Sequence, residues 1–193
     1  MQIIRARDLT SGRWKNGGGE TTQIAVWPLG ASLDTFDWQI NTAQIDKDGP
    51  FSDYRDIDRT FVLLKGGLKL KFDDRPTRVL APGTPPYSFP GDVPTTAELW
   101  GGPAQAFNVM TRRGKWRCSV EGQRQSFRVA ALPGIAKSPR CAVVLVDGSA
   151  TVHSTTRTSL DRLDTVIVDP TTEHIDVSLS PDGLAYLVML EAV

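Results

Sequence analysis

Three short segments of this 193-residue chain carry polar side chains that could contact a ligand. The first is a glycine-rich stretch with the sequence Trp14, Lys15, Asn16, Gly17, Gly18, Gly19. Consecutive glycines lose much conformational entropy on folding, so they are typical of places where the backbone approaches another group closely. Exposed amides of Gly17 and Gly18, flanked by Lys15 and Asn16, would suit an anionic or amide group. A flexible lead-in before the first strand is the alternative interpretation.

The second segment leads from an acidic loop to a charged residue beside an apolar run. The loop spans Asp48–Tyr54, and Arg59 stands directly before Thr60–Leu64. An unpaired charge next to buried apolar residues is expensive, so Arg59 should pair with a carboxylate. The sequence leaves two sources for that carboxylate: a bound ligand, or an acid of the protein such as Asp56 or Asp58.

The third segment is Phe107–Arg113, whose first residues would lie on opposite faces of an extended backbone. Asn108 and Met110 share one face, and Phe107 and Val109 share the other. An asparagine side chain both donates and accepts hydrogen bonds, so Asn108 inside a barrel would orient a small polar ligand. An asparagine at a sheet edge is the alternative.

Most familiar catalytic and metal-binding patterns are absent from the sequence. The only histidines, His153 and His174, form no His-x-His pair, and no Cys-x-x-Cys occurs. The glycine run fits neither the Walker nor the dinucleotide pattern, and Gly-x-Ser-x-Gly is missing. We therefore predict no metal ion and no other cofactor. Two alternatives remain, a metal ion held between the histidines, and calcium or acid–base chemistry at the carboxylates of Asp46–Asp58.

The overall charge excludes one class of partner. With 22 basic and 22 acidic residues the formal net charge is zero, which argues against a strongly basic nucleic-acid binder. Residues 1–19 carry several charges and no apolar core segment, so they do not resemble a secretion signal. The longest apolar run, Leu184–Leu190, is far shorter than the roughly 20 residues of a membrane helix. We expect a cytoplasmic protein with free thiols and no nucleic-acid or membrane partner, with a homodimer left open.

A period of two residues runs through much of the chain, as expected of strands with one buried face. The alternating segments are Phe36–Ile40, Leu68–Phe72, Trp116–Val120 and Ile175–Leu179. Short apolar runs, which are typical of strands buried on both faces, occur at Phe61–Leu64, Ala142–Val146, Val166–Val168 and Leu184–Leu190. Turns are predicted at Asp48–Pro50, Lys65–Gly67, Asp147–Gly148 and Pro181–Gly183. The pattern indicates an all-β fold, with two jelly-roll-like halves or, alternatively, one larger sandwich.

Taken together, the three segments resemble the HutD/Ves family, bicupin proteins associated in bacteria with histidine-utilisation genes. The matching residues are Trp14–Gly19 followed by Thr21 or Thr22, Phe36–Ile40, Gly49–Ser52, Arg59 and Asn108–Arg112. The resemblance implies a double-stranded β-helix (cupin) fold in each half, packed as one compact unit. Residues 1–113 would form the half with the candidate pocket and residues 114–193 the second half.

The general cupin pattern places a metal-binding glutamate seven positions before a turn glycine, and counting back from Gly66 gives Arg59. The metal-binding histidines of the pattern would lie just upstream, where this chain has Ser52–Arg55. A guanidinium at the place of a cation-binding carboxylate reverses the charge preference of the pocket. The resemblance therefore implies a pocket for a small organic anion rather than for a metal ion.

Together, these inferences predict a metal-free protein that binds a small molecule. It would sense or sequester a small carboxylate of histidine degradation, such as formylglutamate or urocanate, in the regulation of histidine utilisation. Arg59 would clamp the carboxylate. The other expected ligand-binding residues are Asn108, Lys15, Asn16, Gly17 and Gly18 for polar contacts, Trp14, Phe51, Phe89 and Met110 for the apolar wall, and Ser52.

Two other functions stay open. A metal-independent isomerase, epimerase or hydrolase would use Tyr54, Asp53 or Lys15 for acid–base chemistry. No matched acid–base pair is visible, so a binding protein is preferred to an enzyme. A partner-binding protein with a vestigial cavity would use the basic stretch Arg112–Arg117 or the loop Leu132–Pro139.

Overall fold

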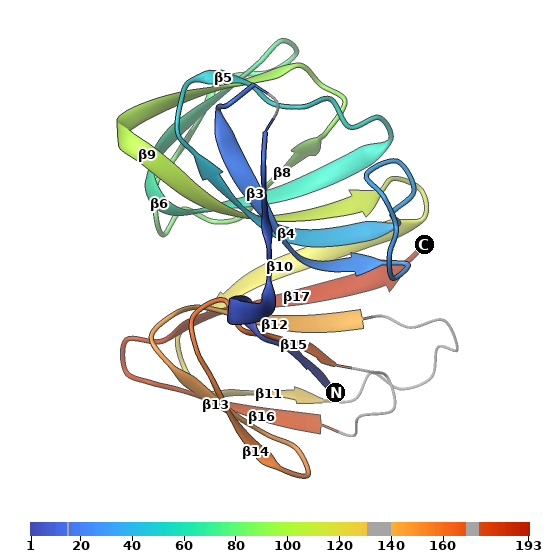
Figure 1. Ribbon diagram of the computed structural model, residues 1–193, viewed down its shortest axis with the longest axis vertical. Helices are drawn as coiled ribbons and strands as arrows, with labels where there is room; N and C mark the ends of the chain where they lie inside the picture. The colour runs from blue at the N-terminus through green and yellow to red at the C-terminus, as the bar shows by residue number, and fades with distance from the viewer. Residues whose placement is uncertain (15, 131–139, 169–173) are drawn as a thin grey trace. The chain divides into compact units, whose positions relative to one another are not determined.

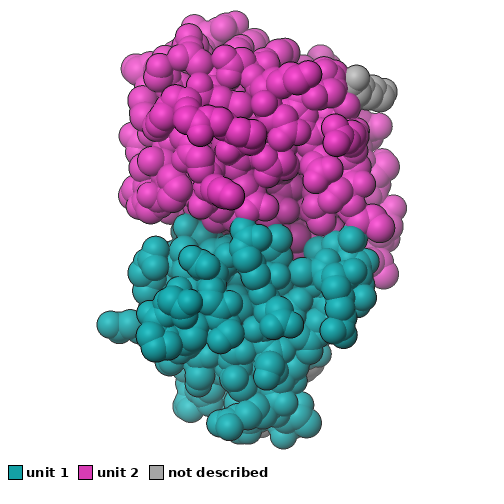
Figure 2. Space-filling model, turned by 60° about the vertical axis from the view of Figure 1, so that its left-hand side comes forward, with its two compact units in different colours: residues 1–9, 117–193 teal, residues 10–116 magenta. Residues whose placement is uncertain are grey.

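The computed structural model describes residues 1–14, 16–130, 140–168 and 174–193, which form strands and one short 3-10 helix, η1 (Ala6–Asp8). No helix in this part of the chain has the length and apolar composition needed to cross a membrane. The strands divide between two compact units, residues 10–116 and residues 1–9 with 117–193 (Figure 2). Residues 1–9, assigned to the first half from the sequence, lie in the second unit because β1 (Gln2–Ile4) pairs with β15 (Thr165–Val168).

The unit of residues 10–116 is built on one antiparallel sheet of eight strands (Figure 1). The strands are β2 (Ser11–Arg13), β3 (Gly19–Trp27), β4 (Trp38–Ile45), β5 (Gly49–Pro50), β6 (Ile57–Phe72), β7 (Arg78–Leu80), β8 (Tyr87–Pro90) and β9 (Thr95–Arg112). Their order is β2-β3-β4-β9-β6-β7, with β5 paired to β9 and β8 paired to β6. Because β6 and β9 pair over almost their whole length, the side chains of both strands are held in a defined register.

The second unit consists of two antiparallel sheets. Their strand orders are β1-β15-β12-β17-β10 and β11-β16-β13-β14. The remaining strands are β10 (Trp116–Gln123), β11 (Phe127–Ala130), β12 (Arg140–Asp147), β13 (Ala150–His153), β14 (Arg157–Leu160), β16 (His174–Leu179) and β17 (Leu184–Ala192). Val143 and Val166 from one sheet share an apolar cluster with Val152 and Ile175 from the other, so the sheets pack face to face.

The burial of side chains follows the predicted periods. In β6, Leu68 and Leu70 are buried, whereas Lys69 and Lys71, which alternate with them, are more exposed. The run Ala142–Val146 is buried throughout β12, as a continuous apolar strand requires. The predicted all-β architecture is confirmed by these elements.

Two of the predicted turns are wrong, and in the first of them a glycine bends the chain without ending the strand. β6 continues through Lys65–Gly67 with two shifts in its register against β9. Gly66 takes up the bend at φ +81°, a conformation that costs a residue with a Cβ roughly 1–2 kcal/mol. Gly49–Pro50 likewise forms the short strand β5, which pairs with β9.

Replacing Gly66 tests how closely β6 approaches the neighbouring strand β9. A Cβ at this position would lie 2.7 Å from the carbonyl oxygen of Pro103 and 2.9 Å from Cα of Ala104. Gly101 is a matched control, since it has φ +78° and a Cβ there would meet no atom within 4 Å. We expect Gly101→Ala to lower the free energy of unfolding by about 1 kcal/mol and Gly66→Ala by about 2–4 kcal/mol. Urea denaturation measures both, and equal losses would contradict the tight approach.

A buried carboxylate attaches the N-terminal segment to the second unit. Asp164 is 3% exposed and accepts hydrogen bonds from Arg5 Nη1 at 2.6 Å, from the Ala6 amide at 2.8 Å and from the Asp161 amide at 3.1 Å. Burial alone would raise the pKa of Asp164, but these donors outweigh it and hold the pKa below its ordinary value of 3.8.

The lowered pKa makes the stability of this unit dependent on pH. Ionised Asp164 stabilises the fold above its unfolded-state pKa of about 3.9, and this contribution is lost as the pH falls through the folded-state pKa. We expect Asp164→Asn to be less stable than wild type at about pH 7 and to lose less stability on acidification. Chemical denaturation between about pH 2 and pH 7 tests this. The same acid dependence in both proteins would show that other groups cause it.

Candidate functional site

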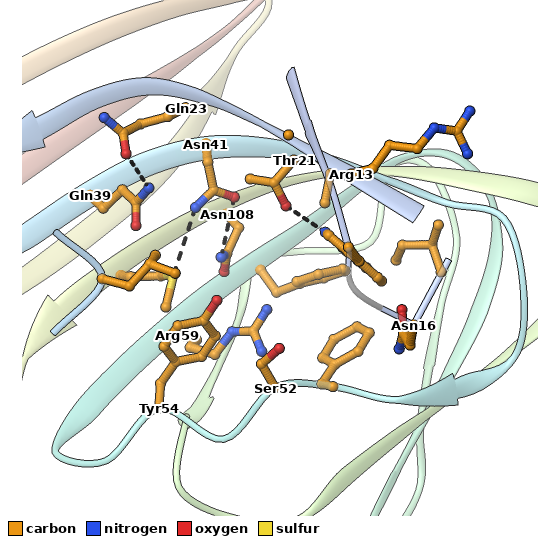
Figure 3. A pocket seen from close by; sticks show the side chains of 18 of the residues that line it. Arg13, Asn16, Thr21, Gln23, Gln39, Asn41, Ser52, Tyr54, Arg59 and Asn108 are labelled. Atoms are coloured by element: carbon orange, nitrogen blue, oxygen red, sulfur yellow. Dashed lines mark hydrogen bonds between the residues drawn. The ribbon is translucent and has the colours of Figure 1, made fainter. Parts of the chain in front are cut away.

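The unit of residues 10–116 contains a cavity of about 720 Å³. The neighbouring strands β3, β4, β9 and β6 form its main wall (Figure 3). The rest of the lining comes from the chain around Thr10–Trp14 and Asn16, from Leu33, and from the segment Pro50–Tyr54. A cavity of this volume accommodates a small organic molecule.

The register of the strands arranges side chains of this wall in rows. In the first row Gln39 of β4 lies opposite Met110 of β9, and Met110 lies opposite Arg59 of β6. Phe89 of β8 is next along the same row. Residues directly opposite each other on neighbouring strands point to the same face of the sheet, so the row places Arg59 on the same side as Gln39.

A second row lies two residues further along the same strands, on the same face of the sheet. It consists of Gln23 on β3, Asn41 on β4, Asn108 on β9 and Phe61 on β6. Asn108 and Met110 therefore both face the pocket, on the shared face that their spacing predicts. Asn108 is 3% exposed, so it is an interior residue and does not lie at a solvated sheet edge.

Arg59 is a buried cation that no described residue neutralises. Its side chain is 8% exposed, it makes no hydrogen bond or ion pair with another described residue, and its Nε lacks a partner. Three aromatic rings surround the guanidinium, with Cζ at 4.8 Å from the centroid of Phe51, 5.3 Å from Phe89 and 5.7 Å from Tyr54. Burial lowers the pKa of Arg59 to about 10, against a smaller opposite effect of Tyr54, so the group stays charged at neutral pH.

The protein acids that the sequence offered to Arg59 do not pair with it. Asp58 instead accepts a hydrogen bond from Arg113 Nε at 2.9 Å, and Arg113 also pairs with Asp92. No aspartate or glutamate occurs among the described residues that line the pocket. The local charge of the site is therefore positive.

A chain of amide side chains covers part of the wall (Figure 3). Asn41 Nδ2 donates to Met110 Sδ at 3.6 Å, and Asn108 Nδ2 donates to Asn41 Oδ1 at 3.5 Å. Gln39 Nε2 donates to Gln23 Oε1 at 2.9 Å. Asn108 Oδ1 is buried and has no partner among the described residues.

The sequence did not reveal Gln39 and Asn41 as pocket residues. They alternate with Trp38 and Ile40, which is the pattern of a strand with one solvated face. Gln39 is 3% and Asn41 4% exposed, because the face opposite the core closes a cavity. The sequence carries no signal that separates these two residues from those of a solvated strand face.

The glycine-rich loop is a turn between β2 and β3. The Trp14 amide donates to the Gly19 carbonyl at 2.9 Å, and the Gly17 amide donates to the Trp14 carbonyl at 3.0 Å. Asn16 Oδ1 accepts a hydrogen bond from the Gly18 amide at 2.9 Å. The amides expected to face a ligand are thus used within the turn.

The loop's main contribution to the pocket is an aromatic ring. Trp14 lines the cavity, and its Nε1 donates to Thr21 Oγ1 at 2.8 Å. Asn16 lines the cavity as well but is exposed. A Cβ at Gly19 would collide with the carbonyl oxygen of Gln44, so glycine permits this close approach. Lys15 lies outside the described residues.

Some of the remaining residues that the sequence predicts for the site line the pocket, and others do not. Phe51, Ser52 and Tyr54 line the pocket, and Ser52 is exposed. Phe89 is buried against the guanidinium but is not part of the lining, and Asp53 is not part of it either. Of the acid–base candidates, Tyr54 alone is placed at the cavity by the described structure.

The basic stretch considered for partner binding makes contacts within its own unit. Arg112 Nε donates to the Phe36 carbonyl at 3.0 Å, and its guanidinium carbon lies 5.7 Å from the Phe36 ring centroid. Arg113 is held by its two aspartates. The loop Leu132–Pro139 lies outside the described residues.

The residues of the pocket do not fit the metal ion that the general cupin pattern holds. Neither histidine nor cysteine occurs in the described lining, and carboxylates are missing there too. His153 and His174 are exposed residues of the second unit. No group of three or more potential metal-binding side chains occurs among the described residues.

Comparison with known proteins gives the family. The sequence model of the HutD family matches residues 6–187. A Pseudomonas putida protein named as an uncharacterised 21.2 kDa protein in the hutC 3′ region is 33% identical over 122 residues, 63% of this chain and 63% of that protein. Protein Ves of Cronobacter sakazakii is 30% identical over 135 residues, 69% of this chain and 73% of that protein. The match thus covers less than two thirds of the first relative.

Solved structures show the same fold. HutD from Pseudomonas fluorescens SBW25 aligns with a TM-score of 0.82 and 26% identity, over 100% of this chain and 98% of that chain. A cupin 2 conserved barrel domain protein from Leptotrichia buccalis aligns with a TM-score of 0.62 and 10% identity, over 98% of this chain and 96% of that chain. The predicted cupin fold and family resemblance are both confirmed, and this chain belongs to the HutD family.

Proposed function

We propose that this protein binds a small organic carboxylate in the cavity of residues 10–116, with Arg59 as the counter-ion and without a metal ion. The observation that carries the proposal is the burial of Arg59, 8% exposed and with Nε unpartnered, in a cavity whose described lining contains no acid. Removing a charge from water costs several kcal/mol unless an opposite charge is present. An anion in the pocket recovers part of this cost, whereas a metal cation is repelled.

The surroundings of Arg59 suit a carboxylate in geometry as well as in charge. β6 is flanked by β8 and β9 at this position, so the backbone of Arg59 is held on both sides. The rings of Phe51 and Phe89 restrict the guanidinium, which reduces the entropy lost when a ligand binds. A planar guanidinium donates two parallel hydrogen bonds to a carboxylate, a pairing that a point charge cannot reproduce.

The finer part of the proposal concerns the source of the carboxylate. We propose an intermediate of histidine degradation, with formylglutamate and urocanate as the first candidates. Support comes from the relative named for the region 3′ of hutC and from the family itself. Aromatic rings and amides in the same cavity suit both a conjugated acid and an acyl amino acid. A protein that binds such an acid without converting it would sense or sequester it, and so would act in the regulation of histidine utilisation.

Substitution of Arg59 tests the proposal. We expect Arg59→Gln to weaken the binding of formylglutamate or urocanate by about 10-fold to 100-fold, because a charge-assisted hydrogen bond contributes roughly 1.5–3 kcal/mol. Isothermal titration calorimetry on metal-stripped wild type and variant measures this, with formate and glutamate completing the panel. Circular dichroism establishes that the variant is folded.

Arg55→Gln is the matched control. Arg55 is exposed, its substitution removes the same charge, and it does not line the pocket. The affinity of this variant should stay within about twofold of wild type, because exposed charges are screened by salt. Equal affinity in folded Arg59→Gln would overturn the proposal, and so would binding that disappears after chelation. Turnover of the bound acid would identify an enzyme.

A further inference from the structure

We infer that the pocket selects carboxylates whose neighbouring group is an uncharged N–H donor, and that Met110 is the positioning residue that sets this preference. The inference rests on the proposed carboxylate at Arg59. It goes beyond that proposal because it assigns the second hydrogen bond of the ligand. The direction of the hydrogen bonds that lead from Met110 to Asn108 supports it.

The direction of these hydrogen bonds follows from the chemistry of sulfur. A thioether has lone pairs but no hydrogen to donate, so it only accepts hydrogen bonds. The Asn41 side chain therefore turns its Nδ2 toward Met110 Sδ, at 3.6 Å, and its Oδ1 away. Asn108 meets that oxygen with its own Nδ2, at 3.5 Å, because two amide oxygens would repel each other.

One hydrogen-bond acceptor is left over at the Asn108 end of this series of hydrogen bonds. Asn108 Oδ1 is buried and has no partner among the described residues. A buried polar atom without a hydrogen bond costs roughly 1–3 kcal/mol, so the site favours any ligand that supplies a donor there. Without the sulfur, both amides could rotate by half a turn and present a donor instead.

The unpartnered acceptor and the unpartnered cation are neighbours on one wall. Asn108 is paired with Phe61, and Arg59 is two residues before Phe61 on the same face of β6. Diagonal neighbours of this kind lie within reach of a long side chain. In Figure 3 the Asn108 amide points into the space that holds the Arg59 guanidinium and the Tyr54 hydroxyl.

A ligand satisfies both atoms if it carries a carboxylate and an adjacent N–H group. The N–H should be uncharged, because no acid in the described lining would balance an ammonium beside Arg59. An amide N–H meets these conditions, whereas the ammonium of a free amino acid does not. The geometry therefore points to N-acyl amino acids as the ligand class.

Isosteric ligands test the inference. We expect wild type to bind N-acetyl-L-glutamate at least about tenfold more tightly than 2-acetoxyglutarate, the ester in which oxygen replaces N–H, and than L-glutamate. The ester would place an oxygen lone pair against Asn108 Oδ1. Competition calorimetry against the best acid of the Arg59 panel provides the affinities. Binding of amide and ester within about twofold of each other would overturn the inference and leave the carboxylate site intact.

Met110→Leu separates positioning from packing. Leucine keeps an apolar side chain of similar volume but removes the acceptor, so the preference for amide over ester should fall to about twofold or less. Met189→Leu, at a partly buried methionine of the second unit, is the control and should keep the full preference. A merely structural role of Met110 would weaken both ligands equally. Full preference in folded Met110→Leu would overturn its assignment, whereas loss of all carboxylate binding in wild type would overturn the proposed function itself.

Discussion

The cost of keeping a guanidinium out of water governs the candidate site. Arg59 lies in the interior of the unit of residues 10–116 with no acid beside it among the residues that the structure describes, and desolvation lowers its pKa while leaving it charged. The rings of Phe51, Tyr54 and Phe89 compensate for part of this cost through cation–π contacts. A structural arginine would be expected to have a carboxylate partner, as Arg113 has in Asp58 and Asp92. The contrast between these two arginines in one unit is the strongest reason to regard Arg59 as a ligand-binding residue.

The fold holds this charge in place through the pairing of its two longest strands. β6 and β9 keep their register from Ile57 to Phe72, interrupted only by shifts near Gly66. This register puts Met110 opposite Arg59 and Asn108 one row away, so the cation, the thioether and the amide chain are fixed relative to one another. Counting back seven positions from Gly66 by the general cupin pattern predicts a metal-binding glutamate where this chain has Arg59. A guanidinium in place of that carboxylate would reverse the electrostatic preference of the pocket within a shared fold.

Much of the fold and part of the site were predictable from the sequence, for physical reasons. The alternation of apolar and polar residues predicted the strands. Arg59 stood out because a charge adjoining the run Thr60–Leu64 has to be buried or paired. Gln39 and Asn41 were not predictable, since alternation distinguishes two faces of a strand but not a solvated face from one that lines a cavity. The predicted turn at Lys65–Gly67 failed because positive φ serves a bulge as well as a turn. Whether the amides near Gly17 were free depended on hydrogen bonds that only the folded loop defines.

The central claim is that Arg59 is retained for binding at the expense of stability, and the free energy of unfolding of Arg59→Met tests it most directly. Methionine fills much of the same space without a charge, so ligand-free Arg59→Met should be more stable than wild type by about 1–2 kcal/mol. Formylglutamate at about 100 times the wild-type dissociation constant should then stabilise wild type by about 2.7 kcal/mol and the variant, at its 10-fold to 100-fold weaker affinity, by only about 0.4–1.4 kcal/mol. A ligand-free variant that is less stable than wild type would show that the arginine serves the fold, and would contradict the account.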